Sequence, residues 1–254
     1  MTYANVMARL EAAGAEQTRK TYRRHGMPEP MFGVSFAILG TLAKQLKRDH
    51  ALALALWASG NLDARFLATM VAEPARCTPD LLDAWVRSAG GHTLASYAAG
   101  LARHGPLDVA VAQAEAWIAD PAETVQRAGW SLVAELALAD AAPPDGWLDG
   151  LLPRIEAAIH AAANRAKEGM NSALIAIGTR DDRLEGLAIA AARRIGKVEV
   201  DHGDTACKTP LAEPYILKSR AHRREQAAKA AAKLAAKATA KPAAKAAAKP
   251  AGQP

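Results

Sequence analysis

His92 and Ser96 are a pair of residues whose types could do chemistry together. They stand four residues apart, a spacing that places both side chains on one face of a helix. A serine becomes a nucleophile when an adjacent base takes its proton, and a third group orients that base. No orienting acid is evident near the pair, so we do not expect it to be catalytic.

A second chemically capable set is Asp201, His202, Asp204 and Cys207. These residues mix hard and soft metal ligands within one segment, and no second cluster elsewhere completes a site. Asp and Gly are also the residues that turns use. We therefore predict a turn and no metal. A glycine-rich phosphate-binding loop is missing from the sequence, and no cofactor is expected.

Three arginines could contact a nucleic acid. Arg65, Arg127 and Arg183 each follow a turn and lie early in a helical pattern, beside small apolar residues. Such an arginine either contacts phosphate or packs its stem along the neighbouring helix and pairs with an Asp of the preceding turn. Both interpretations stay open, and Arg127 is the foremost candidate for DNA contact.

The C-terminal tail, residues 218–254, is strongly basic. It carries ten Lys or Arg against one acid, whereas residues 1–217 hold 22 basic and 25 acidic residues. Few bulky apolar residues follow Leu234, and Pro242 and Pro250 interrupt any helix, so we expect the tail to be disordered alone. Its charge predicts nonspecific nucleic-acid binding, and a solubilising tail is the alternative. The candidate contacts recur every four residues: Lys229, Lys233, Lys237, Lys241, Lys245 and Lys249.

Short helices are the elements that would position these residues. Half of the residues are apolar, only 5% are aromatic, and Ala and Leu dominate, which favours helices over strands. Ser35, Asp49 and Thr78 each precede an apolar run with helical period, and Asp120-Pro121 predicts another helix with Asp120 as its N-cap. The fold class is therefore all-α.

The helices also show signs of a repeat. The turn-and-helix pattern around Arg65 recurs around Arg127 and Arg183, which is typical of HEAT-like repeats with a period of about 40–47 residues. We predict a HEAT-like α-solenoid of antiparallel helix pairs over residues 1–217, closing with an extended loop at 197–217. An irregular helical bundle is the alternative. Four tryptophans are expected to pack between repeats rather than to stack on bases: Trp57, Trp85, Trp117 and Trp147.

Cysteine usage and hydropathy point to the compartment. Cys77 and Cys207 are far apart and predict neither a disulfide framework nor a tetrahedral metal site. No apolar run approaches the ~20 residues of a membrane span, and no signal peptide is expected. These features predict a cytoplasmic, nucleoid-associated protein without a membrane partner.

Five stretches of the sequence resemble the same protein family. These stretches are residues 31–44, 55–68, 123–130, 172–178 and 198–210. Over roughly residues 20–217 the chain resembles bacterial DNA alkylation repair proteins of the AlkD type, which are HEAT-repeat DNA glycosylases. The resemblance implies a solenoid whose concave, basic face cradles duplex DNA. It also implies excision of cationic alkylated bases, such as 3-methyladenine and 7-methylguanine, by an Asp flanked by tryptophans.

The positions that carry this activity in the family are changed here. The catalytic Asp falls on Ser96, or on Ala95 if the register shifts by one, and the first tryptophan falls near Gly91 or His92. The second tryptophan falls on Ser172. A carboxylate would stabilise the positive charge that develops on the sugar, and neither serine nor alanine supplies one. The catalytic residues therefore stay unknown.

We expect a DNA-binding relative of these glycosylases, acting on double-stranded DNA as a monomer, whose base excision is lost or weak. One alternative is an active alkylpurine glycosylase that uses another carboxylate, with Asp83 and Glu168 nearest the shifted site. The other alternative is a HEAT scaffold for a protein partner. A basic stripe along the concave face would favour DNA, and a neutral or acidic one would favour a protein.

Overall fold

The structure is a computed structural model that describes residues 1–141, 143–144 and 146–246, with side chains in the last helix described through Lys233. Its elements are α1 (Tyr3–Ala12), α2 (Glu16–Arg24), α3 (Phe36–Leu46), α4 (His50–Ala58), α5 (Leu62–Val71), η1 (Pro74–Arg76), α6 (Pro79–Ser88), α7 (His92–Ala99), η2 (Gly100–His104), α8 (Leu107–Ile118), α9 (Glu123–Leu138), α10 (Trp147–Ala158), α11 (Asn164–Arg180), α12 (Asp182–Ile195) and α13 (Ala212–Ala246). None of the described residues lies in a strand, which confirms the all-α prediction.

Most of the predicted helix starts are confirmed. The side chains of Ser35, Asp49 and Thr78 each accept a hydrogen bond from the backbone N–H three residues on, at 3.4, 3.0 and 3.2 Å. The prediction for Asp120 was wrong, because α9 begins only at Glu123. Asp120 instead accepts hydrogen bonds from the Ala122 N–H and from Arg87 of α6, so it links two repeats rather than capping a helix.

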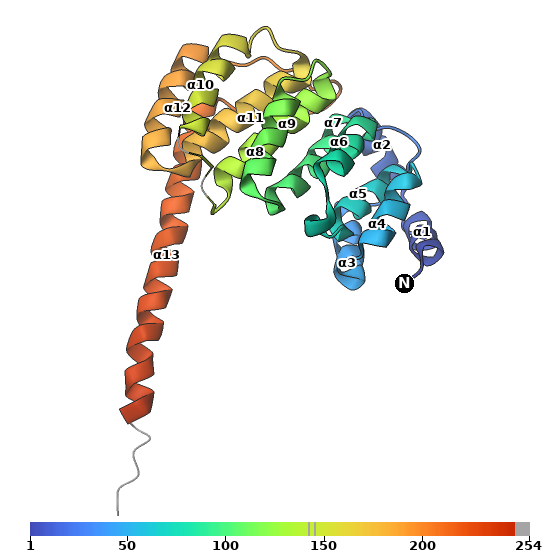
Figure 1. Cartoon of the computed structure of the whole chain (residues 1–254), viewed down its shortest axis with the longest axis horizontal. Coiled ribbons are helices and arrows are strands. Elements are labelled where there is room, and N and C mark those ends of the chain that lie inside the picture. Colours follow the sequence, from blue (N-terminus) through green and yellow to red (C-terminus); the bar gives the residue numbers. More distant parts are fainter. Residues whose placement is uncertain (142, 145, 247–254) are drawn as a thin grey trace, which may run out of the picture.

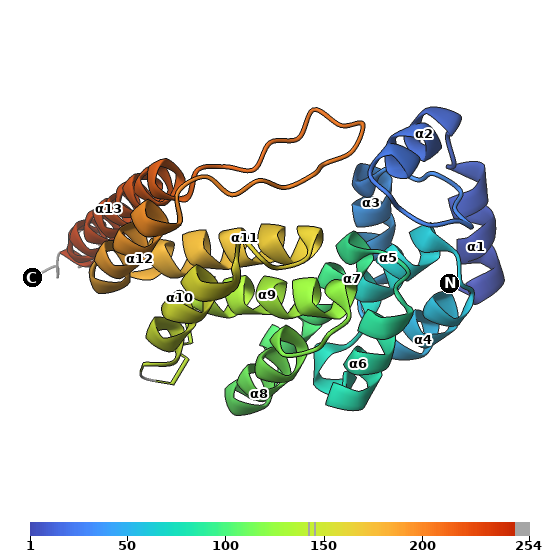
Figure 2. The ribbon, with the colours of Figure 1, turned by 90° about the horizontal axis from the view of Figure 1, so that it is seen from above.

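The helices stack in two rows, as predicted for HEAT-like pairs. Figure 2 shows α5, α7, α9 and α11 as one row, which we call the inner row. The helices α4, α6, α8 and α10 form a second row beside it, which we call the outer row. Small residues let the inner helices approach closely: a Cβ on Gly169 of α11 would lie 2.9 Å from both Arg127 Cδ and Trp130 Cβ of α9. The apolar core runs continuously through the stack, from Val6 of α1 to Ile216 of α13.

The tryptophans connect successive outer helices. The rings of Trp57 and Trp85 stack with centroids 4.3 Å apart and planes within 2°. Trp117 donates its indole N–H to Asp83 of α6, and Trp147 donates its own to Glu115 of α8. The prediction that these residues pack between repeats is confirmed for all four.

The C-terminal segment is more helical than the sequence predicted. The extended stretch ends at Leu211, so residues 212–217 belong to α13 rather than to a loop. This helix runs on through Pro242 to Ala246 and projects from the body (Figure 1). Alanine and lysine are strong helix formers, and Glu225 pairs with Lys229 one turn on. The tail expected to be disordered is therefore helical as far as the structure describes it, and Pro250 lies outside the described residues.

The start of the tail, placed at residue 218, falls inside α13 and not at a boundary. The Arg220 side chain is only 9% exposed, and its guanidinium pairs with Asp182 and with Glu185 of α12. It also donates to the carbonyls of Thr179 and Arg180 at the end of α11. The first turns of α13 are thus part of the solenoid.

Candidate nucleic-acid interface

Polar side chains form stripes on three neighbouring helices of the inner row. On α7 the stripe is His92 and Ser96, and on α9 it is Arg127, Ser131 and Glu135. On α11 it is Arg165, Glu168 and Ser172. Residues three or four apart share a helix face, so each stripe lies along one face of its helix. Because α9 packs against both α7 and α11, the three stripes lie side by side.

A chain of hydrogen bonds joins the stripes. Arg127 donates to the Ser131 hydroxyl, Ser131 donates to Ser96 at 2.9 Å, and Ser96 donates to the carbonyl of His92 at 2.9 Å. Arg127 Nε also lies 3.7 Å from Glu168 Oε2. Ser96, where the resemblance places the catalytic Asp, and Arg127, the foremost candidate for DNA contact, are therefore joined in one network.

Arg127 is a buried cation. Burial lowers the pKa of its guanidinium, an effect that Glu168 opposes and Arg165 strengthens. An arginine stays charged at neutral pH even so. Its side chain is 15% exposed and already has a carboxylate neighbour. The positive charge of Arg127 is therefore held in a mostly buried side chain just below the surface.

Five residues of the stripes line a hollow on the inner row, which we call the inner groove: Ser96, Arg127, Ser131, Glu135 and Ser172. Its volume is about 670 Å³.

 The groove is lined by residues from α5, α7, η2, α9 and α11 and from the turn before α4: Arg48, Thr69, Met70, Ser96, Tyr97, Gly100, Leu101, Arg103, His104, Arg127, Ser131, Glu135 and Ser172.

The charge of the inner groove is positive. Three arginines line it, Arg48, Arg103 and Arg127, against one carboxylate, Glu135. Glu135 is itself paired with Arg103 at 2.8 Å. Burial lowers the pKa of His104, and the charges of Arg103 and Arg48 lower it further against the opposing effect of Glu135. His104 is therefore neutral at pH 7, and the arginines carry the charge of the groove.

His92 does not line the inner groove. It lies at the start of α7 beside the segment His25–Pro28. Burial lowers the pKa of its imidazole, as do the charges of Arg165 and Arg127, with Glu168 and Glu123 opposing. The imidazole is thus neutral at pH 7. The hydroxyl of Ser96 donates to the backbone of His92 rather than to its ring, so the ring does not activate the serine.

The segment between α12 and α13 runs beside α11. Asn164 exchanges two hydrogen bonds with the backbone of Asp201, each 2.7 Å long, and Asn171 donates to the carbonyl of Pro210. Asp201 also accepts from the N–H of Gly203, whose φ of 59° is one that glycine adopts readily. Asp and Gly therefore form a turn here, as predicted.

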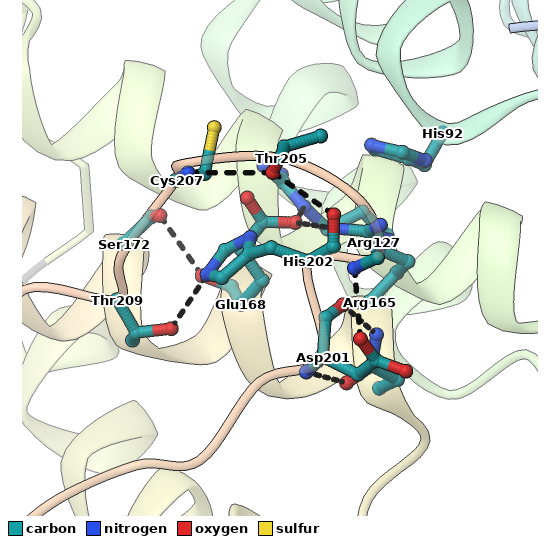
Figure 3. A network of polar contacts seen from close by, with 12 residues as sticks. His92, Arg127, Arg165, Glu168, Ser172, Asp201, His202, Thr205, Cys207 and Thr209 are labelled. Carbon is teal, nitrogen blue, oxygen red and sulfur yellow. Dashed lines mark hydrogen bonds and ion pairs between the residues drawn. The ribbon is translucent and has the colours of Figure 1, made fainter. Parts of the chain in front are cut away.

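His202, Thr205 and Thr209 of the same segment are joined by hydrogen bonds. His202 Nε2 lies 3.0 Å from the Thr209 hydroxyl, and Thr205 donates to the carbonyl of His202 (Figure 3). Cys207 is exposed. Within the described part of the chain, no three His, Cys, Asp or Glu residues are arranged to hold a metal ion.

The two alternative carboxylates lie in different places. Asp83 is on the outer helix α6, where it accepts hydrogen bonds from Trp117 and Arg87, and it does not line the inner groove. Partial burial raises the pKa of Asp83, but these hydrogen bonds and the charge of Arg87 outweigh it and hold the pKa below its ordinary value. Glu168 is on the inner helix α11, paired with Arg165 at 3.3 Å and near Arg127.

The other predicted DNA contacts have protein partners. Arg65 donates to the carbonyls of Trp57 and Ser88, and its guanidinium lies 5.3 Å from the centre of the Trp57 ring. Arg183 makes a bidentate pair with Asp149. Both guanidinium groups therefore bind other parts of the protein, but the partner is not an Asp of the preceding turn: Arg65 binds backbone carbonyls and Arg183 binds an Asp of α10. DNA contact by either stays a prediction.

The tail lysines are only partly described. Lys229 pairs with Glu225, and the Lys233 side chain is exposed. Lys237, Lys241 and Lys245 lie on α13 at positions where only the helix is described. The prediction for Lys249 lies outside the described residues.

Sequence reasoning missed several residues of the inner groove. Glu135 could have been found, because Arg127, Ser131 and Glu135 are spaced four apart and must share a face of α9. Tyr97 is adjacent to Ser96 but looks like an ordinary helix residue. Arg103 lies in a short 3₁₀ helix, and nothing in its local sequence indicates that it faces α9.

The fold and the groove define a HEAT-like helical-repeat protein. The sequence matches the family described as DNA alkylation repair enzyme over residues 6–213, and the chain belongs to that family. It is 30% identical to the uncharacterized protein Lin0241 of Listeria innocua and to the uncharacterized protein Lmo0209 of Listeria monocytogenes. Each match covers 87% of this chain and 98% of the relative.

A solved structure is similar to this one with a TM-score of 0.79 and 30% sequence identity, over 88% of this chain and 96% of the other. That protein is described as one of a new family related to the HEAT-like repeat DNA glycosylases, with affinity for branched DNA structures. The predicted family and HEAT-like fold are therefore confirmed. Among the described residues, no helix is long and apolar enough to span a membrane.

Proposed function

We propose that this protein binds branched DNA through the inner groove and does not excise alkylated bases. The observation that carries the proposal is the chemistry of the groove: three arginines line it, while Ser96 occupies the position that the resemblance gives to a catalytic Asp. The affinity of the structurally similar protein for branched DNA supports the choice of ligand. Phosphates are the groups that clustered arginines recognise, so the groove suits a nucleic-acid backbone.

The lack of base excision follows from the state of the carboxylates. Cleavage of a glycosidic bond develops positive charge on the sugar, and a nearby anion stabilises it. Ser96 and Ser172 carry no charge at neutral pH. Glu135 is paired with Arg103, and Glu168 is paired with Arg165, so each negative charge is already offset. An unpaired carboxylate facing the sugar is what the chemistry would need.

The alternative of an active glycosylase is less well supported by the geometry. Asp83 is committed to Trp117 and Arg87 on the outer row, away from the groove. Glu168 is the better placed of the two, since it lies on the inner helix α11. The scaffold alternative would fit a neutral or acidic inner face, and the arginines of the groove favour DNA instead.

Binding assays with matched DNA substrates test the proposal. Fluorescence anisotropy would compare a four-way junction, a flap and a linear duplex of the same sequence. Arg103→Gln removes a groove cation that is 43% exposed, and Arg154→Gln removes a 48% exposed arginine of α10 that is paired with Glu115. Loss of a charge-assisted hydrogen bond to phosphate costs about 1.5 kcal/mol or more, roughly tenfold in affinity.

We expect the wild type to prefer the branched substrates, Arg103→Gln to bind them roughly tenfold more weakly, and Arg154→Gln to bind like the wild type. Equal affinity for branched and linear DNA would contradict the choice of ligand. Equal effects of the two substitutions would contradict the choice of surface.

A further inference from the structure

Tyr97 is an aromatic side chain that the proposed function has not yet used. It lines the inner groove beside Ser96, and 44% of its surface is exposed. An exposed aromatic ring inside a groove lined by arginines combines two features that nucleic-acid sites use: a flat surface for a base and positive charge for the phosphates. The neighbouring residues thus suggest what kind of ligand the ring would meet.

The ring is held rigidly despite its exposure. It stacks on Phe36 of α3, with centroids 5.6 Å apart and planes 20° from parallel. It also meets Phe66 of α5 edge to face, with centroids 5.3 Å apart. Phe36 and Phe66 contact each other at 4.9 Å, so three helices contribute to one aromatic cluster. Because the ring is already ordered, a ligand that stacks on it pays little conformational entropy.

The cations beside the ring are fixed as well. Arg48 donates to the carbonyls of Met70 and Ala72 at the end of α5, and Arg103 is paired with Glu135 of α9. A base that reached Tyr97 would carry its phosphates into this positive surrounding. A base inside a duplex has both faces covered by its neighbours, whereas an unpaired base offers a free face.

We infer that Tyr97 is the platform on which an unpaired base at the branch point of DNA stacks. The inference rests on the proposed function, since it names the part of a branched substrate that the inner groove recognises. Arg48 and Arg103 bind the phosphates next to that base. Linear duplex, which offers no free base, binds to the arginines alone.

Photochemical crosslinking tests the contact directly. A flap or gapped junction carries 5-iodouracil at an unpaired position next to the branch point, and a second substrate carries it at a paired position in one arm. Irradiation joins this base to an aromatic ring stacked on it, and mass spectrometry of the peptides identifies the residue. We expect a crosslink at Tyr97 from the unpaired position only. A crosslink elsewhere, or one that is equal from both positions, would overturn the inference.

Substitutions provide an independent measurement. Tyr97→Phe keeps the stacking surface, Tyr97→Leu removes it while keeping apolar bulk, and Tyr3→Leu removes a 41% exposed tyrosine of α1 outside the groove. Stacking of one base is worth about a tenfold change in affinity or more. Tyr97→Leu should bind the flap and the gapped junction, which hold unpaired bases, roughly tenfold more weakly and the linear duplex unchanged, while the other two variants match the wild type.

The outcomes separate this inference from the proposed function. If the wild type does not bind branched DNA, both fail. If it binds and Tyr97→Leu binds equally well, only the role of Tyr97 fails. Should Tyr97→Leu prove unstable in thermal unfolding, the crosslink on the wild type still decides the question.

Discussion

Removing the exposed part of the basic tail is the most quantitative perturbation that the structure offers. The cut should follow Gln226, because Arg220 and Arg224 pair with carboxylates of α12 and belong to the body. Deleting residues 227–254 then removes six lysines and no acid. A cut at residue 218 would confuse loss of charge with loss of the buried Arg220.

The magnitude follows from counterion release. Each phosphate contact contributes about 0.9 to the slope of log affinity against log salt, so six contacts contribute at most about 5. Between 50 and 200 mM salt, a slope of 5 changes the affinity by about three orders of magnitude. The Lys229 ammonium is paired with Glu225, which lowers the number of contacts that we expect below this limit.

The assay is anisotropy of a labelled duplex measured at several salt concentrations. We expect the truncated protein to bind more weakly at low salt and to show a flatter slope than the full chain. A full-length variant with the six lysines changed to glutamine controls for loss of the helix itself, and it should behave like the truncation. An unchanged affinity and slope in both variants would show that the tail only solubilises the protein.

Three further predictions follow from the described contacts. Release of 3-methyladenine or 7-methylguanine from alkylated duplex should equal the spontaneous rate, and time-resolved release above it that Glu168→Gln abolishes would restore the glycosylase alternative. Arg220→Ala should lower the free energy of unfolding by about 2–3 kcal/mol in chemical denaturation, because it leaves partly buried acceptors unpaired, and a loss under 0.5 kcal/mol would contradict its structural role. Asp83→Asn should lower the free energy of unfolding at pH 7. The pKa of Asp83 is lowered in the folded protein, so its carboxylate stabilises the fold at pH values above its ordinary pKa of 3.8, and this stability is lost as the pH falls through the folded pKa. The difference in unfolding free energy from wild type should therefore shrink below about pH 4.

Local sequence signals predicted the helices well because their causes are local. Ser35, Asp49 and Thr78 cap helices by accepting hydrogen bonds from backbone N–H groups three residues away, so their role can be predicted from the local sequence. The same reasoning failed at Asp120, where Arg87 lies 33 residues earlier in the chain and binds the carboxylate. A partner far away in the sequence thus gives Asp120 a role that its local sequence does not predict.

The end of the chain shows a different failure. Its composition lacks the bulky apolar residues that a core needs, which predicted disorder beyond residue 218. The structure buries Ile216 and Arg220 of α13 against the body, and the helix continues from that anchored start. A helix whose first turns are fixed by packing does not bear the cost of nucleation, so good helix formers can extend it.

The all-α class, the repeat pattern and the basic tail could be predicted from the sequence, because they depend on residue types and short spacings. The change at Ser96 was implied only by the resemblance to the family. Which charged side chains are free to bind a ligand depends on contacts between helices, which the sequence does not reveal. Asp63 and Asp83 look alike in the sequence, yet Asp63 is buried and accepts three backbone N–H groups, whereas Asp83 holds Trp117. The inner groove likewise joins Arg48 to Tyr97 and Arg103, which lie about 50 residues later in the chain, through the packing of helices whose contacts no local pattern specifies.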